Sequence, residues 1–398
     1  MRVLMIAPTS FFSDYGGHIR ILEEARTLGE KGVEVAIVTY YKGNDVPGID
    51  IRRTASLPWR TDYEVGSSRH KIAFDAYLAV KSMKEVRRFR PDIIHGHMHE
   101  GALIGGVLAR LFGRPLVFDY QGSLTAEMVD HHFLNPDGFV YPWALRMETI
   151  ITQRLPDAIL TSSSKAADLL REKFGVPEGM IHTLPDCADP VQFDPARFSY
   201  SRDAHPLRRR FNIAPNTVIV GYLGLLTDYQ GIPHLIEAAV ECRRRDIDAH
   251  FLVMGYPNVD HYRTLAKKRG VDDLVTLTGR IPFDNAPYFL SACDIAVAPK
   301  MSTSEGSGKL LNYMAMELPV VAYDTPVNRE YLGDLGVYAA AGDAAAFTAA
   351  TISLIHDPAR GKEIGRKLRG RAIEKFSWPV AAGEIVRIYK KLDERRKR

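Results

Sequence analysis

Near-continuous apolar strands alternate with helical periods along almost the whole chain, and this alternation restricts the fold more than any other feature. The strand-like runs are RVLMIAP, VEVAIVTYY, DIIHGH, PLVFDY and AILTSS in the first half, and TVIVGYLG, AHFLVMG, LVTLTG, IAVAPK and PVVAYD in the second half. Strands that are apolar throughout are typical of parallel sheets covered by helices on both faces. The sequence therefore predicts an α/β protein with two tandem, doubly wound, Rossmann-like domains.

A segment that follows neither period separates the two halves. At 398 residues the chain is too long for one ordinary core. Residues 185–198 (PDCADPVQFDPARF) are rich in proline and aspartate and are the expected linker, so we expect an N-terminal domain at 1–188 and a C-terminal domain at 189–376. Because open α/β sheets bind ligands at the carboxyl ends of their strands, we expect the domains to face one another across a cleft that holds the site.

The cysteines and the hydropathy pattern indicate the cellular compartment of the protein. The cysteines, Cys187, Cys242 and Cys293, have neither metal-ligand nor redox spacing, so we interpret them as buried thiols in a reducing compartment. No run of about 18 apolar residues is present, and the N-terminus enters a strand directly, which disfavours a spanning helix and a signal peptide. These features predict a cytoplasmic protein.

The net charge of +4 is modest, but the basic residues are clustered. The basic runs are Arg87, Arg88 and Arg90, residues 208–210, and the C-terminal RRKR. Most such runs are solvated surface, and peripheral contact with an anionic inner membrane face is the alternative. We expect no nucleic-acid partner, because no recognised motif or aromatic-interleaved stripe accompanies the charge.

The stretch STSEGSGKLLNYMAMELPVVA, residues 302–322, carries the strongest site signal. A glycine loop there can turn its N–H groups toward phosphate oxygens, and Lys309 adds a point charge at the start of the next helix. The candidate donor contacts in this stretch are Ser304, Glu305, Gly306, Ser307, Gly308, Lys309, Leu310 and Asn312. A Walker A loop is excluded, because no Ser or Thr follows Lys309 in the required frame. The alternative for Lys309 is an ordinary surface lysine on a capped helix.

Two further glycine loops follow strands. Gly16 and Gly17 precede an amphipathic helix, whose N-terminus suits an anion. In GYLGLLTDYQG the loop between Gly224 and Gly231 can approach a ligand closely, with Asp228, Tyr229 and Gln230 as its polar residues. Ordinary strand–helix connections are the alternative in both places. Neither loop completes the dinucleotide fingerprint G-x-G-x-x-G, which disfavours a Rossmann dehydrogenase.

Polar residues at two more strand ends are candidate acceptor contacts. His95, His97 and His99 alternate, which would place all three on one strand face as cleft-lining or packing side chains. A metal site is geometrically possible there, but no further ligands are identifiable, so we expect no metal. In DYQGSLTAEM the candidates are Asp119, Gln121 and Glu127.

These motifs, in this order, resemble those of the family 4 glycosyltransferases, which have the two-domain GT-B fold. The matching elements are GG-x-x-R (Gly16, Gly17, Arg20), PLVFDYQG, LPDCADPVQFDP, GYLGLLTDYQG, LTGRIPFDNAPYFLSACDIAVAP and KLLNYMAMELPVVA. The closing segment FSWPVAAGEIVRIYKKL resembles the family's final helix, which implies that residues 377–398 return to the N-terminal domain. The resemblance covers essentially the whole chain.

The resemblance implies transfer of a sugar from a UDP- or GDP-linked donor to a carbohydrate, lipid-linked or small-molecule acceptor, with retained configuration and without a metal or other cofactor. The donor would bind the C-terminal domain and the acceptor the N-terminal domain. Lys309 and Gly17 would then be the catalytic contacts to the diphosphate, and Arg280 or Arg20 would aid Lys309.

The chain departs from the family pattern at several charged positions. Leu225 and Gln230 stand where the family usually has Arg and Lys, and Ser304 and Asn312 stand where it has paired glutamates. Gln121 replaces a common loop histidine. Two interpretations follow: Lys309 takes over neutralisation of the diphosphate in an active enzyme, or the chain is a non-catalytic nucleotide-sugar-binding relative or partner subunit. A sugar-nucleotide epimerase and a phosphorylase are further alternatives.

Overall fold

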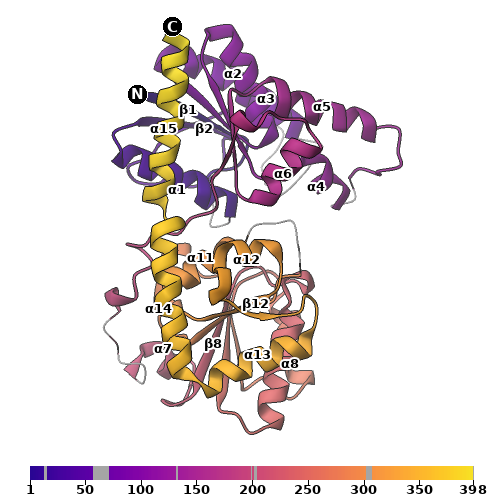
Figure 1. Cartoon of the computed structure of the whole chain (residues 1–398), viewed down its shortest axis with the longest axis vertical. Helices are drawn as coiled ribbons and strands as arrows, with labels where there is room; N and C mark the ends of the chain where they lie inside the picture. Colours follow the sequence, from indigo (N-terminus) through magenta and orange to yellow (C-terminus); the bar gives the residue numbers. More distant parts are fainter. Residues whose placement is uncertain are drawn as a thin grey trace. The chain divides into compact units, whose positions relative to one another are not determined.

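The computed structural model describes residues 1–12, 16–56, 71–130, 133–198, 200, 204–301 and 307–397. The chain divides into two compact α/β units (Figure 1). Unit 1 consists of Met1–Pro185 and Trp378–Arg398, and unit 2 consists of Asp186–Ser377. The predicted class, two tandem Rossmann-like units with parallel sheets, is confirmed.

Within its described residues, unit 1 contains a seven-stranded parallel sheet in the order β3-β2-β1-β4-β5-β6-β7. Its strands are β1 (Arg2–Ala7), β2 (Glu34–Thr39), β3 (Asp50–Arg53), β4 (Ile93–His97), β5 (Leu116–Tyr120), β6 (Ala158–Thr161) and β7 (Ile181–Thr183). Its helices are α1 (Gly16–Glu30), α2 (Lys71–Phe89), α3 (Met98–Phe112), α4 (Leu124–Asp130), α5 (Tyr141–Arg154), α6 (Ser164–Glu172), η1 (Glu178–Met180) and α15 (Trp378–Lys397). Residues 3–7 of β1 are fully buried, as expected for a central strand covered on both faces.

The described part of unit 2 contains a six-stranded parallel sheet in the order β10-β9-β8-β11-β12-β13. Its strands are β8 (Val218–Leu223), β9 (Ala249–Met254), β10 (Val275–Gly279), β11 (Ile295–Ala298), β12 (Val320–Tyr323) and β13 (Val337–Ala339). Its longer helices are α8 (Ile232–Arg244), α9 (Val259–Lys268), α11 (Gly308–Ala315), α12 (Pro326–Leu332), α13 (Ala344–His356) and α14 (Pro358–Lys375). Its short helices are η2 (Pro195–Arg197), α7 (Pro206–Arg210), η4 (Asp228–Gln230), η5 (Phe283–Asn285), α10 (Ala286–Leu290) and η6 (Gly333–Leu335).

Both sheets contain a point where the strand order reverses, and these points position the candidate sites. In unit 1 the order reverses at β1, which pairs with β2 on one side and β4 on the other. In unit 2 it reverses at β8, which pairs with β9 and β11. Loops that leave neighbouring strands in opposite directions open a crevice for ligands at such points. The loops after β1, β4, β8 and β11 are therefore the candidate ligand-binding loops.

The C-terminal helix α15 packs on α1 within unit 1. Tyr389, fully buried on α15, shares a hydrogen bond of 2.6 Å between its hydroxyl and Nδ1 of His95 on β4. The two segments by which the chain enters and leaves unit 2 run side by side, since Ala188 N–H donates to the carbonyl of Phe376 at 2.9 Å.

The cysteines differ in exposure. Cys242 and Cys293 are buried as predicted, whereas Cys187 is partly exposed, because it lies in the segment that connects the units rather than in a sheet or helix. None of the helices formed by the described residues is both long enough and apolar enough to cross a membrane.

Candidate functional site

The side chain of Lys309 lies at the carboxyl edge of the unit 2 sheet. Lys309 is the second residue of α11, and its ammonium donates to Oε1 of Gln230 at 2.7 Å and to the hydroxyl of Tyr222 at 3.1 Å. The same ammonium lies 4.4 Å from the centroid of the Tyr222 ring, a cation–π distance. A helix start, a strand end and the loop after that strand therefore fix one positive charge at the point where the strand order reverses.

Two glycines allow the loop after β8 to take this path. Gly224 has φ +151°, and a Cβ at this position would lie 2.9 Å from Nζ of Lys309. Gly231 has φ +80°, and a Cβ there would lie 2.2 Å from the carbonyl oxygen of Pro299. Because L-residues with side chains rarely adopt these angles, both positions favour glycine for conformation, and Gly231 also requires it for space, since its neighbour is backbone.

A second lysine, Lys300, lies near Lys309. Lys300 follows shortly after the end of β11 and is buried. Burial and, secondarily, the positive charge of Lys300 lower the pKa of Lys309 to about 7. Because the positive charge of Lys300 and burial both disfavour the charged form of Lys309, an anion bound at this edge would be stabilised by the two lysines together. Sequence reasoning missed Lys300, although a lysine directly after the buried run IAVAP was the available signal.

The other residues predicted to bind the donor near α11 differ in whether their side chains can contact a ligand. Ser307 carries a buried hydroxyl that bonds to none of the described residues, and Asn312 is partly exposed one turn further along α11. Leu310 was predicted to contact a donor, but its side chain is fully buried in the core and its N–H donates to the carbonyl of Ser307 at 2.8 Å. Because i and i+1 residues face different sides of a helix, Leu310 points into the core while the side chain of Lys309 reaches Tyr222 and Gln230. Ser304, Glu305 and Gly306 lie outside the described residues.

The other predicted contacts of unit 2 lie at the same edge of the sheet but have partners of their own. Asp228 accepts a hydrogen bond of 2.7 Å from the hydroxyl of Tyr262. Arg280 follows β10, and its guanidinium lies 5.3 Å from the centroid of the Tyr256 ring. Both side chains are exposed, so a direct contact from either to a donor stays a prediction.

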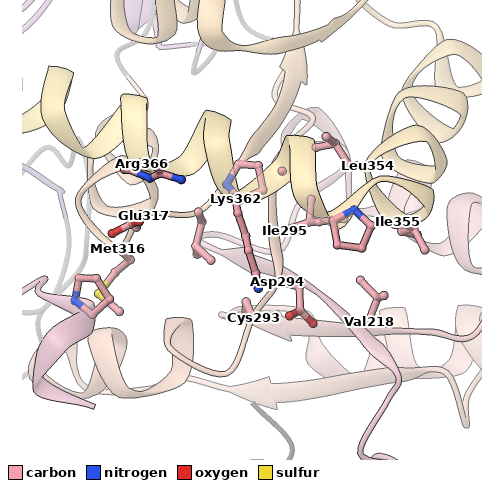
Figure 2. A pocket seen from close by; sticks show the side chains of 15 residues that line it. Val218, Cys293, Asp294, Ile295, Met316, Glu317, Leu354, Ile355, Lys362 and Arg366 are labelled. Carbon is pink, nitrogen blue, oxygen red and sulfur yellow. The ribbon is translucent and has the colours of Figure 1, made fainter. Parts of the chain in front are cut away.

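Unit 2 also has a hollow of about 470 Å³ in another place. Val218 and Ile295, the first residues of β8 and β11, line it together with Lys362 of α14 (Figure 2). This hollow therefore lies at the amino ends of the strands, at the opposite edge of the sheet from Lys309. Because ligands of open α/β sheets bind at the carboxyl ends, we assign no donor role to it.

In unit 1 the structure brings together two loops that the sequence marked separately. Gly17 lies at the start of α1, and a Cβ there would lie 3.1 Å from Oε1 of Gln121, which follows β5. The side-chain amide of Gln121 in turn donates to Oδ2 of Asp119 at 2.9 Å. The glycine turn after β1 and the polar loop after β5 therefore form one surface at the carboxyl edge of this sheet.

A buried ionic network lies beneath that surface. Arg20, only 4% exposed, forms ion pairs with Asp119 at 3.0 Å and Glu24 at 3.1 Å. Nδ1 of His97 lies 3.0 Å from Oδ2 of Asp119. Burial alone would raise the pKa of Asp119, but Arg20 and His97 together hold it well below its usual range. The structure thus gives Arg20 and His97 the role of holding Asp119, and direct contact from either to a substrate stays a prediction.

The prediction that three alternating histidines share one strand face is wrong for His99. His95 and His97 lie on β4 with their rings stacked 4.5 Å apart, but β4 ends at His97 and α3 begins directly at Met98. His99 therefore follows helical geometry and packs against Phe118 and Tyr120. Glu127, predicted as an acceptor contact, is exposed on α4.

Three buried groups of unit 1 meet the distance condition for metal ligands. Possible ligand atoms of Glu24, His95 and His97 lie within 4.8 Å of one another. Arg20 already places a positive charge beside Glu24 and Asp119. We therefore interpret the cluster as a buried polar network that orients the loops above it, in which the guanidinium supplies the charge that a cation would otherwise bring.

Comparison with known proteins agrees with this arrangement. Residues 16–187 match the family described as "Glycosyl transferase 4-like domain", and residues 217–357 match "Glycosyl transferases group 1". The chain is 26% identical to 2-deoxystreptamine glucosyltransferase of Streptomyces kanamyceticus, over 94% of this chain and 98% of that protein. It is also 26% identical to D-inositol 3-phosphate glycosyltransferase of Pseudarthrobacter chlorophenolicus, over 94% and 90% of the two chains.

Solved structures give the same fold. Sucrose-phosphate synthase of Thermosynechococcus elongatus superposes with a TM-score of 0.78 at 18% identity, over 98% of each chain. HepE of Anabaena in complex with UDP gives a TM-score of 0.75 at 16% identity, over 98% of this chain and 100% of that one. The fold is thus that of the GT-B glycosyltransferases. With both halves matched, the chain belongs to glycosyltransferase family 4, and it is a nucleotide-sugar-dependent glycosyltransferase.

Proposed function

We propose that unit 2 binds a UDP-linked sugar and that Lys309 neutralises its diphosphate. The observation that carries this proposal is the position of the Lys309 ammonium, 2.7 Å from Oε1 of Gln230. Gln230 stands where the family usually has the lysine that grips the diphosphate. A cation from α11 therefore reaches the place that the cation of the loop after β8 would occupy, which supports an active enzyme despite Leu225 and Gln230. The complex of HepE with UDP supports the choice of base.

In this proposal charge stabilisation is the main catalytic effect. The bond from the anomeric carbon to the diphosphate oxygen breaks, negative charge develops on that oxygen, and the acceptor oxygen bonds to the anomeric carbon. Lys309, Lys300 and the N-terminal N–H groups of α11 stabilise the developing charge. The acceptor oxygen enters on the face from which the phosphate leaves and passes its proton to the departing phosphate oxygen, so the configuration is retained and no metal is needed. The hydroxyl of Ser307 and the amide of Asn312 are the proposed partners of phosphate or ribose.

We propose that the loops after β1 and β5 in unit 1 present Gly16, Gly17 and Gln121 to the acceptor. A polar cluster near the end of β2 and the start of α3 supports acceptor binding in this unit. Its contacts are an ion pair of 2.5 Å between Lys71 and Glu100 and a hydrogen bond of 2.6 Å from Tyr40 to Asp75. Burial raises the pKa of Asp75 to about 6, so this carboxylate remains mostly charged at pH 7.

The curated relatives guide the choice of acceptor class. Two of them carry names that specify a hydroxylated ring, 2-deoxystreptamine and D-inositol 3-phosphate, as the acceptor. We propose a polyhydroxylated ring for this chain as well, free or as part of a glycan or glycolipid. Carboxylates paired with a lysine and a tyrosine suit the hydroxyl or amino groups of such a ring. A cytoplasmic location, where nucleotide sugars are made, completes the proposal.

Turnover of the Lys309→Ala variant tests the assignment. Removing one electrostatic contact to a developing oxyanion costs about 2.7 to 4 kcal/mol, so UDP-sugar hydrolysis or transfer should slow by roughly 10² to 10³. The matched control is Lys362→Ala, which removes a lysine of the hollow at the opposite edge of the sheet. Equal rates for Lys309→Ala and the unaltered protein, with unchanged donor affinity, would refute the role of Lys309.

A further inference from the structure

Bulky apolar side chains are exposed around the N-terminal end of α5. Phe139 is 89% exposed and Trp143 is 69% exposed, and Phe133, Val140 and Met147 are exposed as well. Val140, Trp143 and Met147 recur at spacings of three and four residues, so they share one face of the helix. Apolar side chains scattered singly are ordinary, whereas a group of large apolar residues exposed on one helix face and in the adjoining loop marks an interaction surface.

The charged residue of this face is basic. Arg146 is exposed between Trp143 and Met147, and the sequence of α5 contains one acidic residue, Glu148. Glu148 is fully buried on the opposite face, where it accepts hydrogen bonds from the N–H groups of Leu124 and Thr125. The outer face of α5 therefore combines aromatic surface with positive charge.

The neighbouring helix α3 also exposes apolar and basic side chains. The two helices approach closely, because a Cβ on Gly106 of α3 would lie 2.8 Å from Cβ of Leu155, and Arg110 donates to the carbonyl of Arg154 at 2.6 Å (Figure 1). The outer face of α3 exposes Leu103, Val107, Arg110 and Leu111. Its one acidic residue, Glu100, lies in the first turn and is paired with Lys71.

We propose that the outer faces of α5 and α3 dock on the surface of an anionic lipid bilayer. Trp and Phe are the side chains that enter the boundary between head groups and acyl chains, and arginines extend to the lipid phosphates. The exposed charges on the outer faces of α5 and α3 are arginines, which a negative membrane surface complements. An exposed acidic residue nearby, Asp137, lies before α5 in the same loop as Phe139. This surface shares no residue with either candidate site, so the inference stands or falls apart from the proposed transferase activity.

Flotation with vesicles tests the proposal on the full chain. Binding to vesicles of phosphatidylcholine with about 30% phosphatidylglycerol at low salt is expected, with little binding to phosphatidylcholine alone and a loss of binding as salt rises. Phe139→Ser/Trp143→Ser should weaken binding by about tenfold or more, since two large apolar side chains no longer leave water. Arg110→Gln/Arg146→Gln should weaken it by roughly fivefold for each arginine.

Matched variants separate binding to lipid from general apolar adhesion. Val191→Ser/Val380→Ser removes exposed apolar side chains elsewhere and should bind vesicles like the unaltered chain. Emission of Trp143 should shift to the blue and be quenched by brominated lipid, and Trp143→Phe should remove that signal while binding persists. No binding of the unaltered chain to anionic vesicles, or equal binding by Phe139→Ser/Trp143→Ser, overturns the proposal. If the unaltered chain self-associates and Phe139→Ser/Trp143→Ser abolishes this, the proposal is also overturned, because the surface then binds a second copy of the chain.

Discussion

At the scale of single residues, the main feature is that Lys309 brings an ammonium to Gln230, which stands where the family usually has a lysine. The loop after β8 lacks the usual cations, yet a lysine that is 79 positions further along the chain supplies an ammonium to Gln230. Lys309 also lies partly buried beside Lys300. The charged form of Lys309 is therefore unfavourable without a bound anion and becomes favourable when an anion binds.

The lowered pKa of Lys309 predicts proton uptake when a nucleotide diphosphate binds. With a pKa of about 7, Lys309 is mostly neutral at pH 8, and a bound diphosphate would raise the pKa and draw in about one proton. Affinity should accordingly fall as pH rises above about 7. Calorimetric titration with UDP at pH 8 in Tris and in HEPES, which differ in ionisation enthalpy, measures the uptake.

The matched variant for this prediction is Lys309→Arg, because arginine stays charged at pH 8. It should bind UDP without the proton uptake. Identical apparent enthalpies for the unaltered chain in the two buffers would contradict the prediction.

Sequence reasoning marked Lys309 and the glycine loops as candidates but did not predict which residues they contact. A lysine between a glycine and an apolar helical period is visible in a local window, as is the glycine pair at Gly16 and Gly17. The contact of Lys309 with Tyr222 joins residues 87 positions apart, and that of Arg20 with Asp119 joins residues 99 positions apart. Such pairs depend on the packing of whole strands. The sequence alone therefore could not show that Arg20 is buried and ion-paired with Asp119 rather than available to contact a substrate.

At the scale of elements, α15 is attached to the unit 1 core by a polar contact as well as by apolar packing. Tyr389 of α15 and His95 of β4 are both fully buried, and their hydrogen bond of 2.6 Å satisfies Nδ1 of that histidine. A buried polar atom left without a partner costs about 1 to 3 kcal/mol.

Tyr389→Phe should therefore lower the free energy of unfolding by about 1 to 3 kcal/mol. Urea denaturation followed by circular dichroism measures it, and Tyr229→Phe, which alters an exposed tyrosine, is the control. Equal midpoints for Tyr389→Phe and the unaltered chain would show that the hydrogen bond contributes nothing to the attachment of α15.

Elements were predictable where a single period covers a whole segment. The buried strands of both sheets were visible as apolar runs, and the helix that starts after the glycine loop begins at Gly308. The prediction of a strand through His99 was wrong at the junction of His97 and Met98, where α3 follows β4 without a loop. An alternating pattern of three histidines cannot show that the backbone changes from strand to helix after the second one.

At the scale of the whole molecule, two Rossmann-like units followed from the repeated alternation of strands and helices, and the family followed from the order of the motifs. The donor and the acceptor did not follow, because contacts to a base or a sugar come from side chains and backbone groups that are brought together only by folding. The residues 302–306, which carry part of the strongest motif, lie outside the described residues, so their predicted contacts stay predictions.

The measurement that tests the central claim most directly is a calorimetric titration of the purified chain with UDP, GDP and ADP, without added metal. We predict micromolar binding of UDP, weaker binding of the other two nucleotides, at least a tenfold loss of UDP affinity in Lys309→Ala, and no loss in Lys362→Ala. Failure of all three nucleotides to bind would contradict the claim and favour a partner subunit without a donor site. UDP binding that Lys309→Ala leaves unchanged would show that another group carries the diphosphate.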